Sequence, residues 1–153
     1  MNTKHLSYME LALKLASAAA ARNEVPVGAI VVDPLKKRIL SLSSNRTEEL
    51  NDATAHAELL ALQEAAIKHG GHRLNGCDLY VTLEPCPMCA AAISLARIRR
   101  LYFGAPDLKS GGVDHGAKIF NQNTCHHRPE IYRGINEIRS QKLLQQFFAS
   151  RRS

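Results

Sequence analysis

The sequence predicts an α/β protein in which helices cover both faces of a mixed β-sheet. Short β-branched runs alternate with longer Ala- and Leu-rich runs, as strands and helices do in this class. The 153 residues suffice for one buried core, and neither an internal repeat nor a low-complexity linker interrupts them. A composition of 45% hydrophobic and 22% charged residues is typical of soluble globular proteins. We therefore expect a single domain over residues 1–153.

The beginning of the chain predicts a helix followed by a hairpin. Residues 6–22 are rich in Ala and Leu, and Ser7 suits the N-cap position of a helix there. The β-branched run 25–32 predicts a strand, after which Asp33-Pro34 indicates a turn. Residues 38–42 then predict a second strand, antiparallel to the first.

The middle of the chain predicts two helices separated by a strand. The polar stretch 45–54 indicates a loop, and a helix should run over 55–69 until two glycines end it. Residues 78–83 predict a third strand. A third helix should cover 85–96, because Pro is favoured in a first turn and an Ala-rich run follows.

The last third predicts a short strand at 101–103, a loop over 104–116 and a helix over 136–150. Residues 130–132 give a weaker signal for one more strand. The two strand-helix-strand crossovers should pair parallel strands, beside the antiparallel hairpin. The expected fold class is therefore a three-layer α/β/α arrangement around a mixed sheet.

Charge and cysteine content narrow the function. Lys and Arg number 20 against 14 Asp and Glu, giving +6 and a pI near 9.4. A basic surface attracts nucleic acids, although so moderate a charge also suits a surface that serves only solubility. We find no signal peptide and no run long enough to cross a membrane. Four cysteines, two of them in a C-x-x-C pair, favour metal or redox chemistry over disulfides, so we expect a cytoplasmic enzyme.

Two short motifs carry the chemistry. His56-Ala57-Glu58 opens one predicted helix, and Pro85-Cys86-Pro87-Met88-Cys89 opens the next. Each follows a strand or a loop, so the two helix N-termini can converge at one edge of the sheet, where ligands bind in open α/β folds.

The residue types in these two motifs predict a catalytic metal site. His56, Cys86 and Cys89 supply three zinc ligands and leave the fourth position for water, unlike a closed structural site. Helix N-termini favour thiolate over thiol. Two thiolates cancel the charge of Zn²⁺ and weaken its effect on that water, so a base is needed, and Glu58 is well placed for this role. We expect one Zn²⁺ per subunit and Glu58 as the catalytic proton carrier.

Each motif alone has a simpler explanation. A lone C-x-x-C is also found in thioredoxin-like proteins or in a core, and a lone His-x-Glu often marks a solvated helix start. Together, in this order and about 30 residues apart, they match the H-x-E…P-C-x-x-C signature of zinc nucleobase deaminases. The combination therefore predicts hydrolytic deamination of a base.

Nearly the whole chain resembles the bacterial tRNA-specific adenosine deaminases of the cytidine deaminase-like superfamily. The stretches that carry the resemblance are Glu24-Val25-Pro26-Val27-Gly28-Ala29, Ser44-Asn45-Arg46, Asp52-Ala53-Thr54-Ala55-His56-Ala57-Glu58, Leu79-Tyr80-Val81-Thr82-Leu83-Glu84-Pro85-Cys86, Phe103-Gly104-Ala105, Asp107 and Phe147-Phe148. The resemblance implies a five-stranded sheet, a homodimer, and conversion of the wobble adenosine in the anticodon stem-loop of an arginine tRNA to inosine.

The resemblance also implies substrate contacts. Asn45 would hydrogen-bond the target base, and Val25 would line its pocket. Asp107 and Lys109 would contact the anticodon backbone, while two residues near the C-terminus, Phe148 and Arg151, would contact the RNA.

The chain departs from the family pattern at three places. Ala53 stands where the family often has Pro, and residues 33–37 lengthen the first hairpin. Residues 111–116, Gly-Gly-Val-Asp-His-Gly, replace the usual small-residue loop, so RNA contacts there do not transfer directly.

Weaker signals have ordinary explanations. The Arg97, Arg99 and Arg100 cluster favours a solvated face over an RNA contact, and Cys77 suits a buried apolar position. Residues 125–127, Cys-His-His, resemble a metal tract, but the first ligand set is already complete.

Three other functions share parts of this pattern. A guanine deaminase acting on the free base shares His-Ala-Glu and Pro-Cys-Pro-Met-Cys, although the basic charge and the Phe-Phe…Arg-Arg end favour RNA. Cytidine or dCMP deamination is less favoured on the same grounds. A non-catalytic zinc or RNA-binding protein would be expected to lack the proton carrier, and Glu58 is present.

Overall fold

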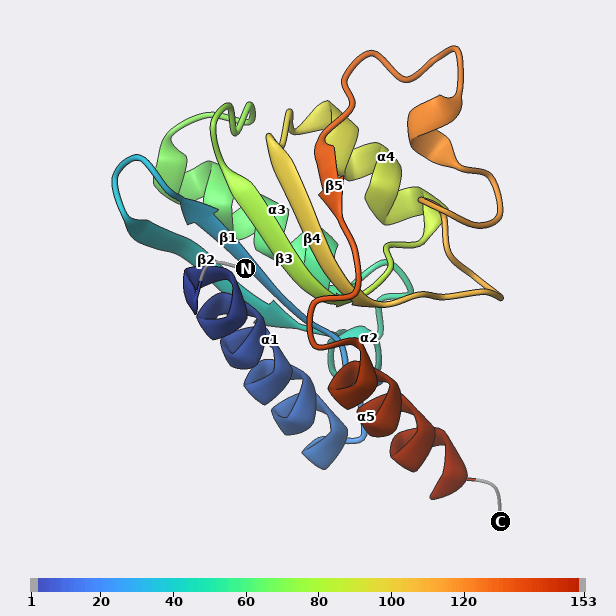
Figure 1. Cartoon of the computed structure of the whole chain (residues 1–153). Coiled ribbons are helices and arrows are strands. Elements are labelled where there is room, and N and C mark those ends of the chain that lie inside the picture. The colour runs from blue at the N-terminus through green and yellow to red at the C-terminus, as the bar shows by residue number, and fades with distance from the viewer. Residues whose placement is uncertain (1–2, 152–153) are drawn as a thin grey trace.

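The computed structural model describes residues 3–151 as a sheet enclosed between helices (Figure 1). The elements in chain order are α1 (Thr3–Ala21), β1 (Gly28–Asp33), β2 (Arg38–Ser44), α2 (Thr47–Leu50), α3 (Ala57–His69), β3 (Asp78–Leu83), α4 (Pro87–Leu95), β4 (Arg100–Ala105), a 3₁₀ turn η1 (Ile119–Asn121), β5 (Glu130–Tyr132) and α5 (Glu137–Ala149).

The sheet is mixed and has five strands in the order β2-β1-β3-β4-β5. β1 is antiparallel to both of its neighbours, whereas β3, β4 and β5 pair in parallel. The expected mixed sheet is confirmed, including the weakly signalled strand at 130–132. One expectation is wrong: the first crossover does not pair its two strands, because β1 lies between β2 and β3. Every residue of β1 is buried, which suits this interior position.

Helices cover both faces of the sheet, as the three-layer prediction requires. α1 and α5 lie on one face, and α3 and α4 lie on the other (Figure 1). Successive strand residues point to opposite faces. Val31 and Leu79 join the core beneath α3 and α4, while Ile30 and Tyr80 join the core beneath α1. This burial on both faces explains the continuous apolar runs of the central strands.

Several boundaries differ from the sequence-based expectations. α1 already includes Thr3, so Ser7 lies within the helix and is not its N-cap. The loop expected over 45–54 contains α2, whose first N–H groups bind the carboxylate of the buried Glu24: Glu48 N donates at 3.1 Å and Glu49 N at 2.8 Å. Because the capping carboxylate comes from more than twenty residues away, the sequence next to α2 gives no signal that a helix begins there.

Gly28 shows why the first layer packs so closely. A Cβ at this position would collide with the carbonyl oxygen of Ala12, in the middle of α1. The absence of a side chain lets α1 approach the start of β1, next to the Pro26-Val27 that precedes the strand. Within residues 3–151, no helix combines the length and the apolar character that a membrane crossing requires.

Candidate active site

His56, Cys86 and Cys89 meet at the N-termini of two helices. His56 is the N-cap residue of α3, Cys86 is the N-cap residue of α4, and Cys89 lies in the first turn of α4. The His56 Nδ1 atom is 3.6 Å from the Sγ atom of Cys86 and 3.6 Å from that of Cys89. Tetrahedral zinc with ordinary bond lengths needs an N···S separation of about 3.6 Å. The three side chains therefore fit a zinc ion, and Nδ1 is the imidazole atom that faces it.

The electrostatics favour a cation at this point. A hydrogen bond from Cys89, and a further one from His56, hold the pKa of Cys86 at about 4. The hydrogen bond with Cys86 in turn raises the pKa of His56. The pKa of Cys89 is raised by its interaction with Cys86 and by burial. One sulfur is thus a thiolate before any metal arrives, whereas the Cys89 thiol must lose its proton to bind a metal.

Glu58 lies beside these ligands, in the first turn of α3, and only 4% of its surface is exposed. Burial raises the pKa of its carboxyl group to about 7, and the nearby Cys86 thiolate adds to this rise. A carboxyl group with a pKa near neutrality can both accept and release a proton at physiological pH. This arrangement suits the proton carrier that the sequence predicts.

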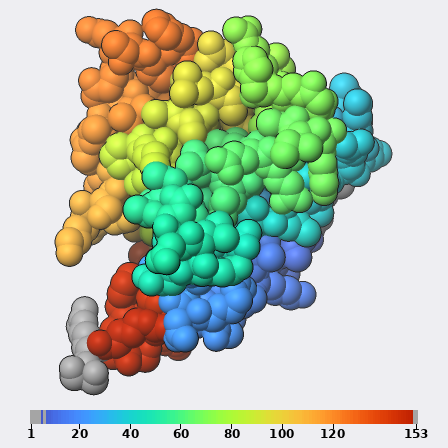
Figure 2. Space-filling view, turned by 180° about the vertical axis from the view of Figure 1, so that it is seen from behind, coloured from blue at the N-terminus to red at the C-terminus, as the bar shows by residue number. Residues whose placement is uncertain are grey.

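A cleft of about 900 Å³ brings together most of the predicted substrate-contacting residues. It lies between the loop after β4 and the C-terminal helix α5, and Figure 2 shows the hollow from behind, between the orange loop and the red helix. Its lining includes Val25, Asp107, Lys109, Phe148 and Arg151. The structure thus gathers residues from three segments that are far apart in the sequence.

Two of these residues are already engaged within the protein. The Asp107 carboxylate accepts hydrogen bonds from the backbone N–H groups of Lys109 at 3.3 Å and Ser110 at 2.9 Å, so it closes its own turn. The Arg151 guanidinium lies 3.5 Å from the centre of the Phe147 ring and donates to Asn23 Oδ1 at 2.8 Å. Lys109 and the half-exposed Phe148 are freer to meet a ligand.

Asn45 does not line this cleft. It is buried, and its side-chain oxygen accepts a hydrogen bond of 2.9 Å from the backbone N–H of Ala57, at the start of α3. This contact places Asn45 close to His56. Because the helix uses the oxygen, the side-chain NH₂ group is what Asn45 can offer to a base.

A second group of potential ligands is less suited to a metal. Asp33, His69 and Cys77 have donor atoms within 4.8 Å of one another. Burial and the Asp33 carboxylate raise the pKa of Cys77 to about 11, so its thiol stays protonated at neutral pH. The carboxylate oxygen Oδ1 of Asp33 already accepts the backbone N–H groups of Leu35 and Lys36.

The other expected bystanders take structural positions. Arg99 forms a two-point ion pair with the buried Asp78, at 2.8 and 3.0 Å, and Arg100 pairs with Glu130 at 2.7 Å. In the Cys-His-His tract, His127 contacts the carbonyl oxygen of Ile98 at 2.7 Å.

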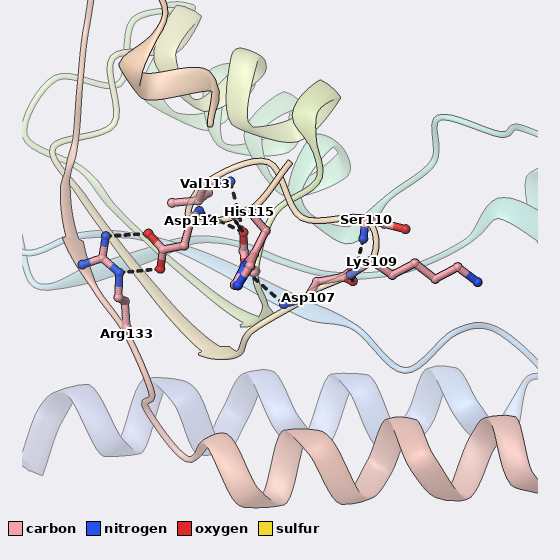
Figure 3. Close-up of polar contacts among 8 residues, drawn as sticks. Asp107, Lys109, Ser110, Val113, Asp114, His115 and Arg133 are labelled. Carbon is pink, nitrogen blue, oxygen red and sulfur yellow. Dashed lines mark hydrogen bonds and ion pairs between the residues drawn. The ribbon is translucent and has the colours of Figure 1, made fainter. Parts of the chain in front are cut away.

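Sequence reasoning gave Glu84 no role beyond its place in a motif. Its side chain is completely buried, and it accepts hydrogen bonds from the loop that follows β4 (Figure 3). Burial alone would raise the pKa of Glu84, but these hydrogen bonds hold it below its usual value. An acidic residue at the end of a buried strand is the signal that could have revealed it.

Comparison with known proteins decides the family. The model of the cytidine and deoxycytidylate deaminase zinc-binding region matches residues 2–105. The chain belongs to this family of zinc-binding deaminases. Within it, the chain is 55% identical to a tRNA-specific adenosine deaminase of Agrobacterium fabrum, over 95% of this chain and 94% of that protein.

Solved structures of deaminases agree with this assignment. A structure from a study of A-to-I editing by tRNA:A34 deaminases at the wobble position has 54% sequence identity and a TM-score of 0.87, covering 90% of this chain and 99% of that one. A guanine deaminase from Nitrosomonas europaea shares only the fold: it has 23% identity and a TM-score of 0.82, covering 94% of this chain and 84% of that one.

Proposed function

We propose that this deaminase converts the wobble adenosine in the anticodon of an arginine tRNA to inosine. The observation that carries the proposal is the pairing of a zinc-fitted cluster with a cleft lined by a lysine and an aromatic side chain. His56, Cys86 and Cys89 match zinc geometry beside the buried Glu58, and Lys109 and Phe148 line a cleft large enough for a nucleotide segment. The relatives that act on tRNA support the choice of substrate.

His56 Nδ1, Cys86 Sγ and Cys89 Sγ would hold the ion. When bound, zinc supplies the Lewis acidity that lets a water molecule act as nucleophile near neutral pH. Glu58 accepts a proton from the water that adds to C6 of adenine and delivers it to N1. Glu58 then helps to protonate the departing amino group, so that water is consumed and ammonia is released.

The other residues hold the base and its flanking nucleotides. The NH₂ group of Asn45 donates to an acceptor of the base, and Val25 packs against the ring. Lys109 neutralises a backbone phosphate, and Phe148 offers an aromatic surface for stacking. Asp107 shapes the turn that carries Lys109, and Arg151 extends the positive charge along α5.

Three further properties belong to the same proposal: one Zn²⁺ per subunit, a homodimer and a cytoplasmic location. The zinc count follows from the three ligands fitted to a single ion. The homodimer and the location are carried over from the family resemblance of the sequence. Sedimentation of the zinc-loaded protein measures the oligomeric state directly.

The deciding experiment compares three substrates on zinc-loaded protein. We expect inosine in a stem-loop whose anticodon begins with A, and no ammonia from free guanine or cytidine. The Glu58→Ala variant is the control, and it should lose roughly 10²–10⁴ in kcat. Ammonia from guanine with unchanged RNA would contradict the substrate, whereas an active Glu58→Ala variant would contradict the role of the carboxylate.

A further inference from the structure

The loop over residues 107–115, which includes most of the stretch that departs from the family pattern, is held by the buried carboxylate of Glu84. At one end of the loop, Asp107 N donates to Glu84 Oε1 at 3.0 Å. At the other end, the backbone N–H groups of Val113, Asp114 and His115 lie 3.0–3.2 Å from Oε2, and His115 Nδ1 lies 2.7 Å from Oε1. One side chain therefore fixes both ends of the loop (Figure 3).

The two glycines of the loop allow this close approach. A Cβ on Gly111 would collide with the Glu84 carboxylate. A Cβ on Gly112 would lie 2.5 Å from Pro87 N, and the Gly112 N–H donates to Pro85 O at 2.8 Å. The loop is thus packed directly on the segment that starts α4.

A second anchor ties the loop to the segment after β5. Arg133 binds the Asp114 carboxylate through two parallel contacts: Nε to Oδ2 at 2.5 Å and Nη2 to Oδ1 at 2.7 Å. Such a two-point pair fixes orientation as well as distance. Both side chains are partly exposed, so the pair can be altered without opening the core.

These anchors determine where Lys109 is presented. The turn of Asp107, Lys109 and Ser110 lines the cleft, and its first residue is bound by Glu84. In Figure 3 the Lys109 side chain extends away from the anchored network, whereas Asp114 and Arg133 lie on the opposite side of His115. Binding to RNA costs less when the cation is already held in position.

We propose that Glu84 and the Asp114–Arg133 pair are positioning residues that hold the Lys109 turn for RNA binding and do not react with the base. The inference rests on the proposed function, since it assigns RNA to the cleft. It accounts for the Asp-His sequence in a loop where the family usually has small residues.

Charge reversal of the exposed pair tests the proposal. We expect Asp114→Arg and Arg133→Asp each to raise KM for the anticodon stem-loop roughly threefold to tenfold, with kcat and zinc content unchanged. The combined variant, with the pair reversed, should recover most of the wild-type KM. Removal of another partly exposed ion pair, in the double variant Arg100→Ala/Glu130→Ala, should leave KM unchanged.

Other results would overturn the proposal. Unchanged KM in both single variants, or no recovery in the combined variant, removes the Asp114–Arg133 pair from RNA binding. The Glu84→Gln variant should raise KM with zinc retained, and loss of zinc would assign Glu84 to the metal segment instead. Direct binding of the stem-loop is measured on every variant, which separates the two proposals. Unchanged binding in the variants would contradict the positioning role alone, whereas a wild type that forms no inosine would contradict the proposed function.

Discussion

The two ends of β3 carry the same kinds of side chain in opposite electrostatic states. Beyond the C-terminal end, Cys86 meets His56 at helix N-termini, and its pKa is about 4. Before the N-terminal end, Cys77 meets Asp33 and His69, and its pKa is about 11. The difference comes from the surroundings, because hydrogen-bond donors face one thiol whereas apolar atoms and a carboxylate face the other.

Buried carboxyl groups differ in the same way. Asp78, at the N-terminal end, is neutralised by a two-point contact with Arg99. Glu58, beside the metal ligands, has no arginine or lysine among the groups that shift its pKa, and burial raises that pKa to about 7. Asp78 is compensated by Arg99, and Glu84, just beyond the C-terminal end of β3, is compensated by backbone N–H groups, whereas burial outweighs the other interactions of Glu58. A strongly raised pKa of this kind favours a functional role for Glu58.

The largest expected effect is on metal content. Cys86→Ser should lose zinc and all detectable deamination, because a ligand is removed. Cys77→Ser should keep one zinc per chain and wild-type activity, because its thiol is protonated and buried. Metal analysis of the two purified proteins measures this contrast. Two ions in the wild type, falling to one in Cys77→Ser, would instead show that both ends bind metal.

The next effect is on stability, and it should differ in sign between the two carboxyl groups. The pKa of Glu58 is raised from 4.5 to about 7 by folding, so its contribution to stability is full below pH 4.5 and is lost as the pH rises through 7. At pH 8, Glu58→Gln should therefore raise the free energy of unfolding of the metal-free protein by about 3 kcal/mol. At pH 4.5 the gain should vanish.

Asp78→Asn serves as the matched comparison. It should lower the free energy of unfolding by about 1–3 kcal/mol, because Arg99 loses its charged partner. Urea denaturation of the metal-free variants at both pH values provides the measurement. A destabilised Glu58→Gln at pH 8 would mean that the carboxylate is compensated after all.

The smallest effect concerns thiol reactivity in the metal-free protein. Iodoacetamide at pH 6 should modify Cys86 at least roughly tenfold faster than Cys77, because only Cys86 is a thiolate at that pH and is accessible. Peptide mapping after timed quenching gives both rates in one sample. Equal rates would show that the two thiols do not differ in pKa. As a control, zinc loading should protect Cys86 alone.

Features of this protein that depend on local pattern could be predicted from the sequence. The His56-Ala57-Glu58 and Cys86-to-Cys89 motifs predicted that three potential ligands and a carboxyl group would meet, because their spacing places each motif at a helix start. Period and composition predicted the α/β class and four strands with a weaker fifth, and the family resemblance implied a five-stranded sheet. Even the short strand at 130–132 is where the pattern indicated.

Features that depend on contacts between distant segments could not be predicted from the sequence and are known only from the folded structure. It placed β1 between β2 and β3, capped α2 with Glu24, and separated Asn45 from the cleft that holds Lys109 and Phe148. It also revealed that Glu84 holds the loop over 107–115. A buried carboxylate takes its partners from whichever backbone N–H groups the fold brings to it, and sequence spacing carries no record of that choice.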